Sequence, residues 1–433
     1  MNHNTFKTNH RPDEYGIDDD ELEYRTPFQL AEGGVRVASA KQRTDRRECP
    51  RCHKSDAVVI HDHYVQRIKL RMPDGNVGIL SVEKPKFFCR RCNHCFTIPL
   101  TGVAKGDTLA EVEKAKMKKD FCEMLPFAAI AKDHNISVAH ALRLFDKLHP
   151  SVPRLRLPRA LCIDEILFCS TADAKYPAIL YDFETSEIVD VVRSRQKPYL
   201  EDYFSKIPEG ERKNVKFFIS DMYDTYHRIA KKFFPDATYV VDLFHVVKQL
   251  TDAVSKLRAN LMNSMPKDSF EYGFMKSRWK CFTVRKCEIS RSYYTNRAEG
   301  VTMSCFDAVM LCLNKSQKLW DGWSILQDLY TWDRYATFTE AQKFIEFTAK
   351  RLLETSSELL KSVGRTFWKW RNEIANGLVR HAGGIRFHNC VAEGLNEEIK
   401  KLKEISNGCV CFPRFRKRIL LILNKRRKEN PIF

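Results

Sequence analysis

Three acidic residues form the pattern with the most chemical content in this sequence. Asp164 lies within an otherwise apolar run, residues 161–169, and Asp221 closes a second apolar run, residues 215–221, each with the composition of a buried strand. Glu393 opens a segment with helical periodicity far downstream. A carboxylate in a buried strand is costly unless it is paired or bound to a cation. The three acids therefore predict a site for divalent metal ions.

Cysteine spacing predicts a second and different metal site. Two Cys-x-x-Cys pairs, separated by a β-rich stretch, are formed by Cys49, Cys52, Cys89 and Cys92. Each pair can present two thiolates from one tight turn, and tetrahedral zinc takes four. The spacing is typical of a zinc ribbon, and a closed shell of four thiolates makes the ion structural. Three nearby residues are lower-ranked alternative ligands: Cys95, His53 and His94.

Composition narrows the class of protein that carries these sites. The 433-residue chain is long enough for roughly two to four domains. A formal net charge of +18 favours a polyanionic partner, most simply nucleic acid. The 15 cysteines are odd in number, the first residues do not resemble a signal peptide, and no uncharged stretch approaches the roughly 20 residues that span a bilayer. We expect a reduced, intracellular protein with no membrane contact.

Residues 127–145 have the layout of a helix-turn-helix and follow a predicted helix over residues 110–124. Asn135 suits the turn and Ser137 suits the N-cap of the second helix. That helix would enter the major groove of DNA, although an ordinary helical hairpin has the same pattern. The outward candidates for DNA contact are His140, Arg143 and Lys147. Three prolines then predict a stiff linker: Pro150, Pro153 and Pro158.

The elements around Asp164 and Asp221 have a recognisable order. The Asp164 strand is followed by a hairpin over residues 176–194, a helix, the Asp221 strand, a helix, a strand ending at Asp242 and a long helix. Three antiparallel strands followed by alternating helices and strands is the order of RNase H-like folds. In that fold the first and fourth strands are neighbours at the sheet centre. Asp164 and Asp221 are therefore expected to meet.

These features together resemble a known family. From Cys49 to about Leu423 the chain is similar to the insertion-sequence transposases of the ISL3 family, which are DDE enzymes. Four landmarks carry the resemblance: the zinc ribbon, the helix-turn-helix, residues 242–248, and residues 389–400 continued by Asn407, Gly408 and residues 412–418. One departure is Cys390, where the family usually has glycine. Cys390 is small, so we expect the activity to survive.

The resemblance implies a catalytic triad of Asp164, Asp221 and Glu393. These carboxylates would hold two Mg²⁺ or Mn²⁺ ions about 3.5–4 Å apart. The fold class expected is α/β, an RNase H-like mixed-sheet catalytic domain with a large all-α insertion, preceded by the zinc ribbon and the helix-turn-helix. The expected parts are a disordered polar tail over 1–47, the ribbon over 48–100, the helix-turn-helix over 108–150, and the catalytic domain over 158–433 with its insertion at about 260–385.

Secondary site residues surround the triad. Asp242 and His245 could assist the metal or contact DNA, or Asp242 could simply cap the following helix. Asn396 and Lys400 share the helix face of Glu393, where Lys400 would suit a phosphate.

Two further groups of side chains could contact DNA. The basic C-terminal segment offers Arg414, Arg416 and Arg418 for the DNA backbone, with a solvated charge run as the alternative. Six tryptophans lie in the insertion and could stack on bases, although helix packing is the simpler explanation for each: Trp279, Trp320, Trp323, Trp332, Trp368 and Trp370.

The sequence thus predicts a DNA transposase of a bacterial insertion sequence. It would bind terminal inverted repeats and target DNA, act as a homodimer, and work in the bacterial cytoplasm in association with the nucleoid. Two alternatives are a non-catalytic zinc-ribbon and helix-turn-helix regulator, which would not explain acids in buried strands, and another RNase H-like nuclease, which would not explain the N-terminal modules or the helical insertion.

Overall fold

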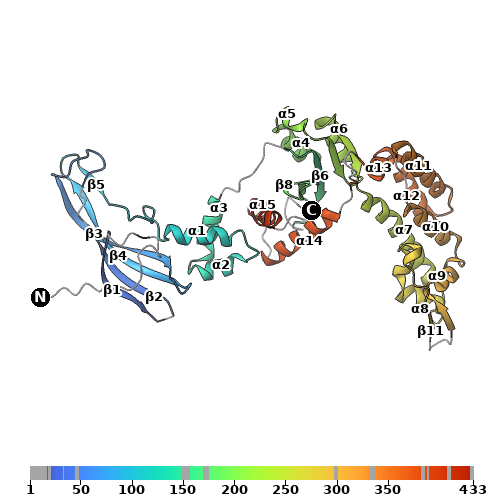
Figure 1. Ribbon diagram of the computed structural model, residues 1–433, viewed down its shortest axis with the longest axis horizontal. Helices are drawn as coiled ribbons and strands as arrows, with labels where there is room; N and C mark the ends of the chain where they lie inside the picture. The colour runs from blue at the N-terminus through green and yellow to red at the C-terminus, as the bar shows by residue number, and fades with distance from the viewer. Residues whose placement is uncertain are drawn as a thin grey trace. The chain divides into compact units, whose positions relative to one another are not determined.

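The chain divides into two compact units. Figure 1 shows the helices and strands from which they are built. The computed structural model describes residues 17, 21–32, 34–43, 48–148, 157–168, 175–296, 301–331, 337–381, 386–387, 390–406 and 411–429. Unit 1 consists of Met1–Ser151, Leu402–Cys409 and Pro413–Lys425. Unit 2 consists of Val152–Lys401, Val410–Phe412 and Arg426–Phe433.

Unit 1 combines a five-stranded sheet with a group of helices. Its strands are β1 (Leu22–Leu30), β2 (Arg36–Gln42), β3 (Val58–Arg71), β4 (Val77–Cys89) and β5 (His94–Phe96). Their order is β1-β2-β4-β3, and β5 pairs with β4. The helices that follow are α1 (Glu111–Asp120), α2 (Phe127–Asp133) and α3 (Val138–Lys147).

The first two strands lie where we expected a polar, disordered tail. In β2 alternate residues, among them Ala38 and Ala40, are buried against Ile68 and Leu80 of the ribbon strands. β2 pairs in parallel with β4, so its stability depends on residues some 40 positions away. The sequence nevertheless contained a signal for two strands, because a Gly-Gly pair at 33–34 separates them. In the structure Gly34 has a φ of +79°.

Helices α2 and α3 form over the residues of the predicted helix-turn-helix, with the expected cap and turn residue between them. The Ser137 hydroxyl accepts a hydrogen bond from the backbone N–H of His140 at 3.2 Å, and Asn135 has the positive φ of +48° that the turn requires. Three phenylalanine rings meet between these helices, with ring centroids 5.0–6.0 Å apart. They belong to Phe121 at the end of α1, Phe127 of α2 and Phe145 of α3. These rings are the centre of the small core that fixes α3.

Unit 2 contains a mixed sheet in the order β10-β9-β6-β7-β8. Its strands are β6 (Ala160–Glu165), β7 (Ala178–Asp182), β8 (Ile188–Val192), β9 (Phe217–Ser220) and β10 (Thr238–Val241), with helices α4 (Lys197–Ser205), α5 (Glu209–Arg212) and α6 (Asp224–Phe233) between them. β7 runs antiparallel to both of its neighbours, β6 and β8, whereas β9 and β10 run parallel to β6. Three antiparallel strands followed by parallel ones is the arrangement we predicted.

The segment after β10 is mostly helical, as the sequence indicates. Its helices are α7 (Leu243–Ser264), α8 (Phe270–Ser277), α9 (Cys305–Leu313), α10 (Gln317–Leu329), α11 (Phe338–Glu354), α12 (Glu358–Lys369) and α13 (Arg371–Leu378), with short 3-10 turns at Trp279–Phe282 and Lys286–Glu288. One apolar core runs from the sheet into these helices. Among the described helices, none is long and apolar enough to cross a membrane.

The prediction of an all-α insertion is wrong in one place. An antiparallel hairpin pairs β11 (Tyr293–Asn296) with β12 (Val301–Ser304). Tyrosine and threonine in β11, and valine and threonine in β12, favour an extended backbone. The local composition therefore favoured strands here, but each strand has only four residues, which is too short for a clear alternating pattern.

We expected residues 158–433 to form one domain, but the last two helices are divided between the two units. Helix α14 (Cys390–Ile405) begins in unit 2 and enters unit 1 at Leu402, and most of α15 (Phe412–Glu429) belongs to unit 1. Arg418 of α15 is only 1% exposed, and its guanidinium donates to the Leu125 carbonyl at 2.6 Å and to the Ser406 hydroxyl at 2.8 Å. It also covers the Phe127 ring. Helix α15 is therefore part of the helix-turn-helix unit.

This packing predicts that Arg418→Ala lowers the free energy of unfolding of unit 1 by about 2–3 kcal/mol, because a buried carbonyl loses its charged donor. Calorimetry of the full chain measures the change. Lys119→Ala, which removes an exposed cation from α1, is the control and should change stability by less than about 0.5 kcal/mol. An Arg418→Ala protein that unfolds like the control would contradict the assignment of α15 to unit 1.

Candidate active site and zinc site

The two acids of the sheet lie at the same level of adjacent strands. β6 and β9 run parallel, with Cys162 beside Ile219. Asp164 and Asp221 each follow these partners by two residues, so the register sets them side by side on one face of the sheet. The structure therefore brings these two predicted site residues together.

Burial makes this carboxylate pair unfavourable without a cation. Burial raises the pKa of Asp164 above its ordinary value. It also raises the pKa of Asp221 from 3.8 to about 6; the negative charges of Glu165 and Asp164 add to this effect, and His245 opposes it. Within the described part of the chain, Oδ1 of Asp221 is buried without a hydrogen-bond partner. Such an oxygen is stabilised by a bound cation.

Asn396 of α14 extends the site. Its Nδ2 donates to Oδ2 of Asp164 at 3.0 Å, and its own Oδ1 is buried without a partner among the described residues. Uncharged and charged oxygens of this kind are the ligands that Mg²⁺ takes in proteins. The residues present therefore fit a divalent cation held by Asp164 and Asp221, with Asn396 orienting Asp164.

Helix α14 carries the other downstream residues that we predicted. Glu393 lies within it, but the side chain of Glu393 is outside the described residues, as are Asn389, Asn407 and Gly408 of the family landmarks. Glu393 precedes Asn396 by three positions, so the two share a helix face. Its role as the third metal ligand remains a prediction. Lys400 is exposed one turn beyond Asn396.

Asp242 occupies the junction between β10 and α7. It is 2% exposed; Oδ1 accepts from the Phe244 backbone N–H at 3.1 Å, and Oδ2 lies 2.7 Å from Nδ1 of His245. Both carboxylate oxygens are thus engaged, which favours the helix-capping role over metal binding. Burial lowers the pKa of His245, but its bond to Asp242 and the charges of Asp242, Asp221 and Asp164 outweigh burial and raise that pKa. The protonated, cationic form of His245 is therefore favoured beside the carboxylate pair.

A second cation beside the site was not predicted. Glu165, the residue after Asp164, forms an ion pair with Arg195. The Arg195 guanidinium lies 4.9 Å from the ring centroid of Tyr176 and 5.0 Å from that of Tyr223. The two rings and the carboxylate hold the guanidinium in one place. The only feature of the local sequence that pointed to this ion pair was the second acid, Glu165, directly after Asp164.

The four predicted cysteines come together in unit 1. Their sulfurs all lie within 4.8 Å of one another, with Cys49 to Cys92 at 3.4 Å and Cys52 to Cys89 at 3.7 Å. Four sulfurs bound to one tetrahedral zinc would be about 3.8 Å apart. Burial raises the pKa of Cys49, but hydrogen bonds from the Arg51 and Cys52 backbone and from neighbouring thiols lower it to about 6, whereas burial and its own neighbouring thiols raise the pKa of Cys92 to about 12. The donor set fits zinc.

The lower-ranked zinc ligands lie apart from this cluster of sulfurs. His53 is bonded to Glu48 at 3.1 Å, His94 stacks on Phe96, and Cys95 is exposed. Among the described residues the cluster is closed by the four cysteines alone. Such a site leaves no position for substrate, so it is structural.

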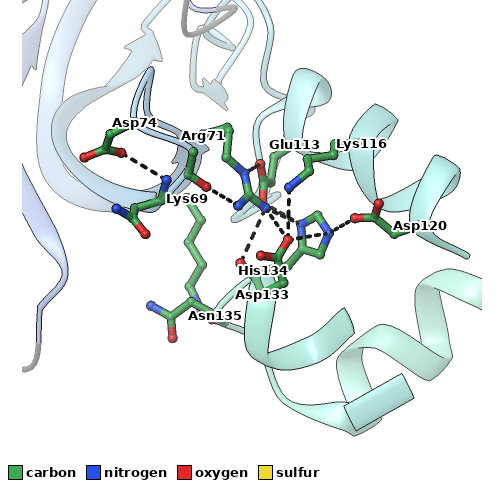
Figure 2. A network of polar contacts seen from close by, with 11 residues as sticks. Lys69, Arg71, Asp74, Glu113, Lys116, Asp120, Asp133, His134 and Asn135 are labelled. Carbon is green, nitrogen blue, oxygen red and sulfur yellow. Dashed lines mark hydrogen bonds and ion pairs between the residues drawn. The ribbon is translucent and has the colours of Figure 1, made fainter. Parts of the chain in front are cut away.

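A charged network attaches the helix-turn-helix to the ribbon sheet (Figure 2). Buried His134 lies between Glu113 of α1 at 2.5 Å and Asp120 at 2.7 Å. Arg71 of β3 donates to Glu113 at 2.8 Å and to Asp133 at 3.0 Å. Asp120, Asp133 and His134 are close enough to share a metal ion, but Arg71 and Lys116 already neutralise Asp133. We therefore regard the group as structural, fixing α1 and α2 against β3.

The predicted DNA-contacting residues fall into two classes. On α3, Arg143 and Lys147 are exposed and His140 is half-buried, as a recognition helix requires. On α15, Arg414 donates to both carboxylate oxygens of Asp146 at 2.8 and 2.7 Å, Arg416 is half-buried, and Arg418 is in the interior. The interpretation of Arg418 as a DNA contact is wrong, because packing against the helix-turn-helix uses its charge.

The zinc site gives a direct prediction. Purified protein should hold about one zinc ion per chain, and Cys49→Ser should lose it because three thiolates bind zinc less tightly than four. Elemental analysis by mass spectrometry measures the zinc. Cys95→Ser is the matched control and should retain the metal. Full zinc content in a Cys49→Ser, Cys89→Ser double variant would rule these ligands out.

Comparison with known proteins agrees with this arrangement. Residues 161–419 match the sequence profile of the ISL3 family of DDE enzymes, described as transposase. This region includes Asp164, Asp221, the helical segment and α14. No curated protein gives a significant match to the chain. Because the profile covers more than half of the chain, this protein belongs to the ISL3 family of DDE transposases.

Proposed function

We propose that this transposase cuts and joins DNA strands at a divalent-metal site formed by Asp164, Asp221 and Glu393. The observation that carries the proposal is the pair of buried carboxylates on adjacent parallel strands, one of which has an unpartnered oxygen. Among the described residues no cationic side chain forms a hydrogen bond with that oxygen, as one would in a completed structural ion pair.

The arrangement of strands supports an RNase H-like catalytic domain. The strand order is β10-β9-β6-β7-β8. The first three strands of this sheet, β6, β7 and β8, form an antiparallel meander, and the last two, β9 and β10, run parallel to β6. This is the arrangement expected of that fold. It sets the first and fourth strands side by side at the centre. Asp164 and Asp221 then meet although 57 positions separate them in the sequence (221 minus 164).

The protein's own groups prepare the site for phosphate chemistry. Two bound Mg²⁺ or Mn²⁺ ions would activate the attacking oxygen and stabilise the leaving oxygen of an in-line displacement. Asn396 fixes the orientation of Asp164, and Asp242 fixes His245 at the start of α7. His245 and Arg195 supply positive charge beside the carboxylates, which favours the approach of a phosphate.

Unit 1 would provide recognition of the element ends. The exposed Arg143 and Lys147 on α3 suit contacts in the major groove, with His140 at the edge of the helix. The zinc ribbon and the network of Figure 2 hold that helix in place. Because two ends must be brought together, we propose a homodimer on DNA. Short inverted repeats flanking the gene would support this role.

Removal of a metal-binding charge should separate binding from chemistry. Asp164→Asn, Asp221→Asn and Glu393→Gln keep the shape of the side chain but not its charge, so each should slow Mg²⁺-dependent cleavage by more than about a hundredfold. Affinity for a terminal-repeat duplex should stay near wild type. Cleavage of a labelled duplex and binding are measured on the same preparations.

Asp242→Asn is the matched control for this series and should reduce cleavage far less, because Asp242 caps α7. Cleavage at a near wild-type rate by Glu393→Gln would remove Glu393 from the triad. Glu397, one turn further along α14, would then be the third candidate ligand.

The raised pKa of Asp221 predicts a stability that depends on pH. Between about pH 4 and pH 6 the folded protein holds a proton on Asp221 that the unfolded chain has released, so the metal-free protein should gain stability as pH falls through this window. At pH 7.5, Asp221→Asn should raise the free energy of unfolding by up to about 3 kcal/mol. Urea denaturation with EDTA present measures both effects. A less stable Asp221→Asn protein would show that the carboxylate is not strained.

A further inference from the structure

The tryptophans of the helical segment differ in a way that packing does not explain. Trp323 and Trp370 are buried at 5% and 3% exposure, and Trp370 stacks on Tyr239 of β10. Trp368, two residues earlier, is 38% exposed, and Trp279 is 46% exposed. Core packing therefore accounts for Trp323 and Trp370 but not for Trp368 or Trp279.

Trp368 belongs to a group of aromatic and basic side chains on the adjacent helices α11 and α12 and at the start of α13 (Figure 1). We call it the aromatic-cation platform, formed by Phe347, Lys350, Arg351, Trp368 and Arg371. Phe347 is 59% exposed. Lys350 lies 5.8 Å and Arg371 5.1 Å from the Trp368 ring, and Arg351 lies 5.6 Å from the Phe347 ring. Trp368 thus has two cations beside its ring, and Phe347, on the same helix as Lys350, has a third.

The cations of the platform are not equally available. Arg351 is paired with Asp328, and Arg371 with Glu346 at 3.2 Å. Lys350 is exposed, and no ion pair engages it within the described part of the chain. A free cation beside a partly exposed indole is matched to a ligand that has both a flat ring and a negative charge.

The platform is attached to the catalytic sheet. Lys369, the neighbour of Trp368, donates to both carboxylate oxygens of Asp224 at 2.7 and 2.8 Å. Asp224 lies three positions after Asp221, at the start of α6. The Asn376 side chain of α13 donates to the Tyr239 carbonyl of β10 at 2.9 Å. The end of α12 is therefore held against the elements that carry the active-site acids.

We propose that the aromatic-cation platform binds unpaired nucleotides of DNA, with bases stacked on Trp368 and Phe347 and a phosphate at Lys350. In duplex DNA the faces of the bases are covered by their neighbours, so only unpaired bases can stack on a side chain. An apolar protein partner would leave Lys350 desolvated and unpaired, whereas a nucleotide supplies the compensating charge. The inference rests on the proposed DNA function and adds where an opened strand is held.

The test compares binding of a labelled 20-nucleotide oligothymidylate with binding of a blunt duplex, using the full-length protein and fluorescence anisotropy. Trp368→Leu keeps apolar volume but loses the stacking face, and should weaken single-strand binding about ten- to a hundredfold while duplex binding changes less than about twofold. Trp368→Phe should retain most of the affinity. Tryptophan fluorescence should fall on binding the single strand in wild type and fall less in Trp368→Phe.

Trp279→Leu is the matched control, since Trp279 is also exposed and also has a lysine, Lys280, 5.6 Å from its ring, but no second exposed ring in the same group. It should bind both probes as wild type. Unchanged single-strand binding in Trp368→Leu, or an equal loss for the duplex, would overturn the proposal. Asp221→Asn should bind the oligothymidylate normally and not cleave, and that result is independent of whether the platform binds bases.

Discussion

Charge repulsion between two buried carboxylates is the constraint around which unit 2 is organised. Asp164 and Asp221 are set side by side by backbone pairing of β6 with β9, so they cannot separate without breaking the sheet. Burial and mutual repulsion hold the pKa of Asp221 near 6. A bound divalent cation would offset this cost, so the same geometry that destabilises the metal-free protein would favour metal binding.

Such a pair can be maintained only in a rigid frame, and the helices after β10 provide it. Gly377 of α13 shows how close the contact is, because a Cβ atom at this position would lie 2.5 Å from the carbonyl oxygen of Val241. Glycine thus allows α13 to approach the end of β10, directly before Asp242. Asp242 then begins α7 and holds His245 next to the carboxylates. The helical segment is therefore a support for the catalytic sheet as well as the carrier of the aromatic-cation platform.

Local sequence patterns were sufficient to predict the features that depend only on residues close together in the chain. The acid within each apolar strand, the two Cys-x-x-Cys turns and the Ser137 cap all depend on residues within a few positions. Contacts between distant segments could not be predicted in this way. Arg418 has the sequence surroundings of a DNA-binding run, yet its partner Leu125 is 293 positions away. A basic run on a helix therefore has two physical outcomes, a solvated face or a buried set of donors, and periodicity alone does not distinguish them.

The course of α14 and α15 links the two units through the chain itself. α14 carries Asn396 at the active site and, two turns later, enters unit 1 at Leu402. Lys417 of α15 then donates to the carbonyls of Phe145 and Asp146 in the last turn of α3. The packing of α2 and α3 is thus completed by residues synthesised after the sheet of unit 2 and the helices that follow it. Because domains generally fold as they emerge during synthesis, we expect the catalytic sheet to be formed before the recognition helix reaches its final packing.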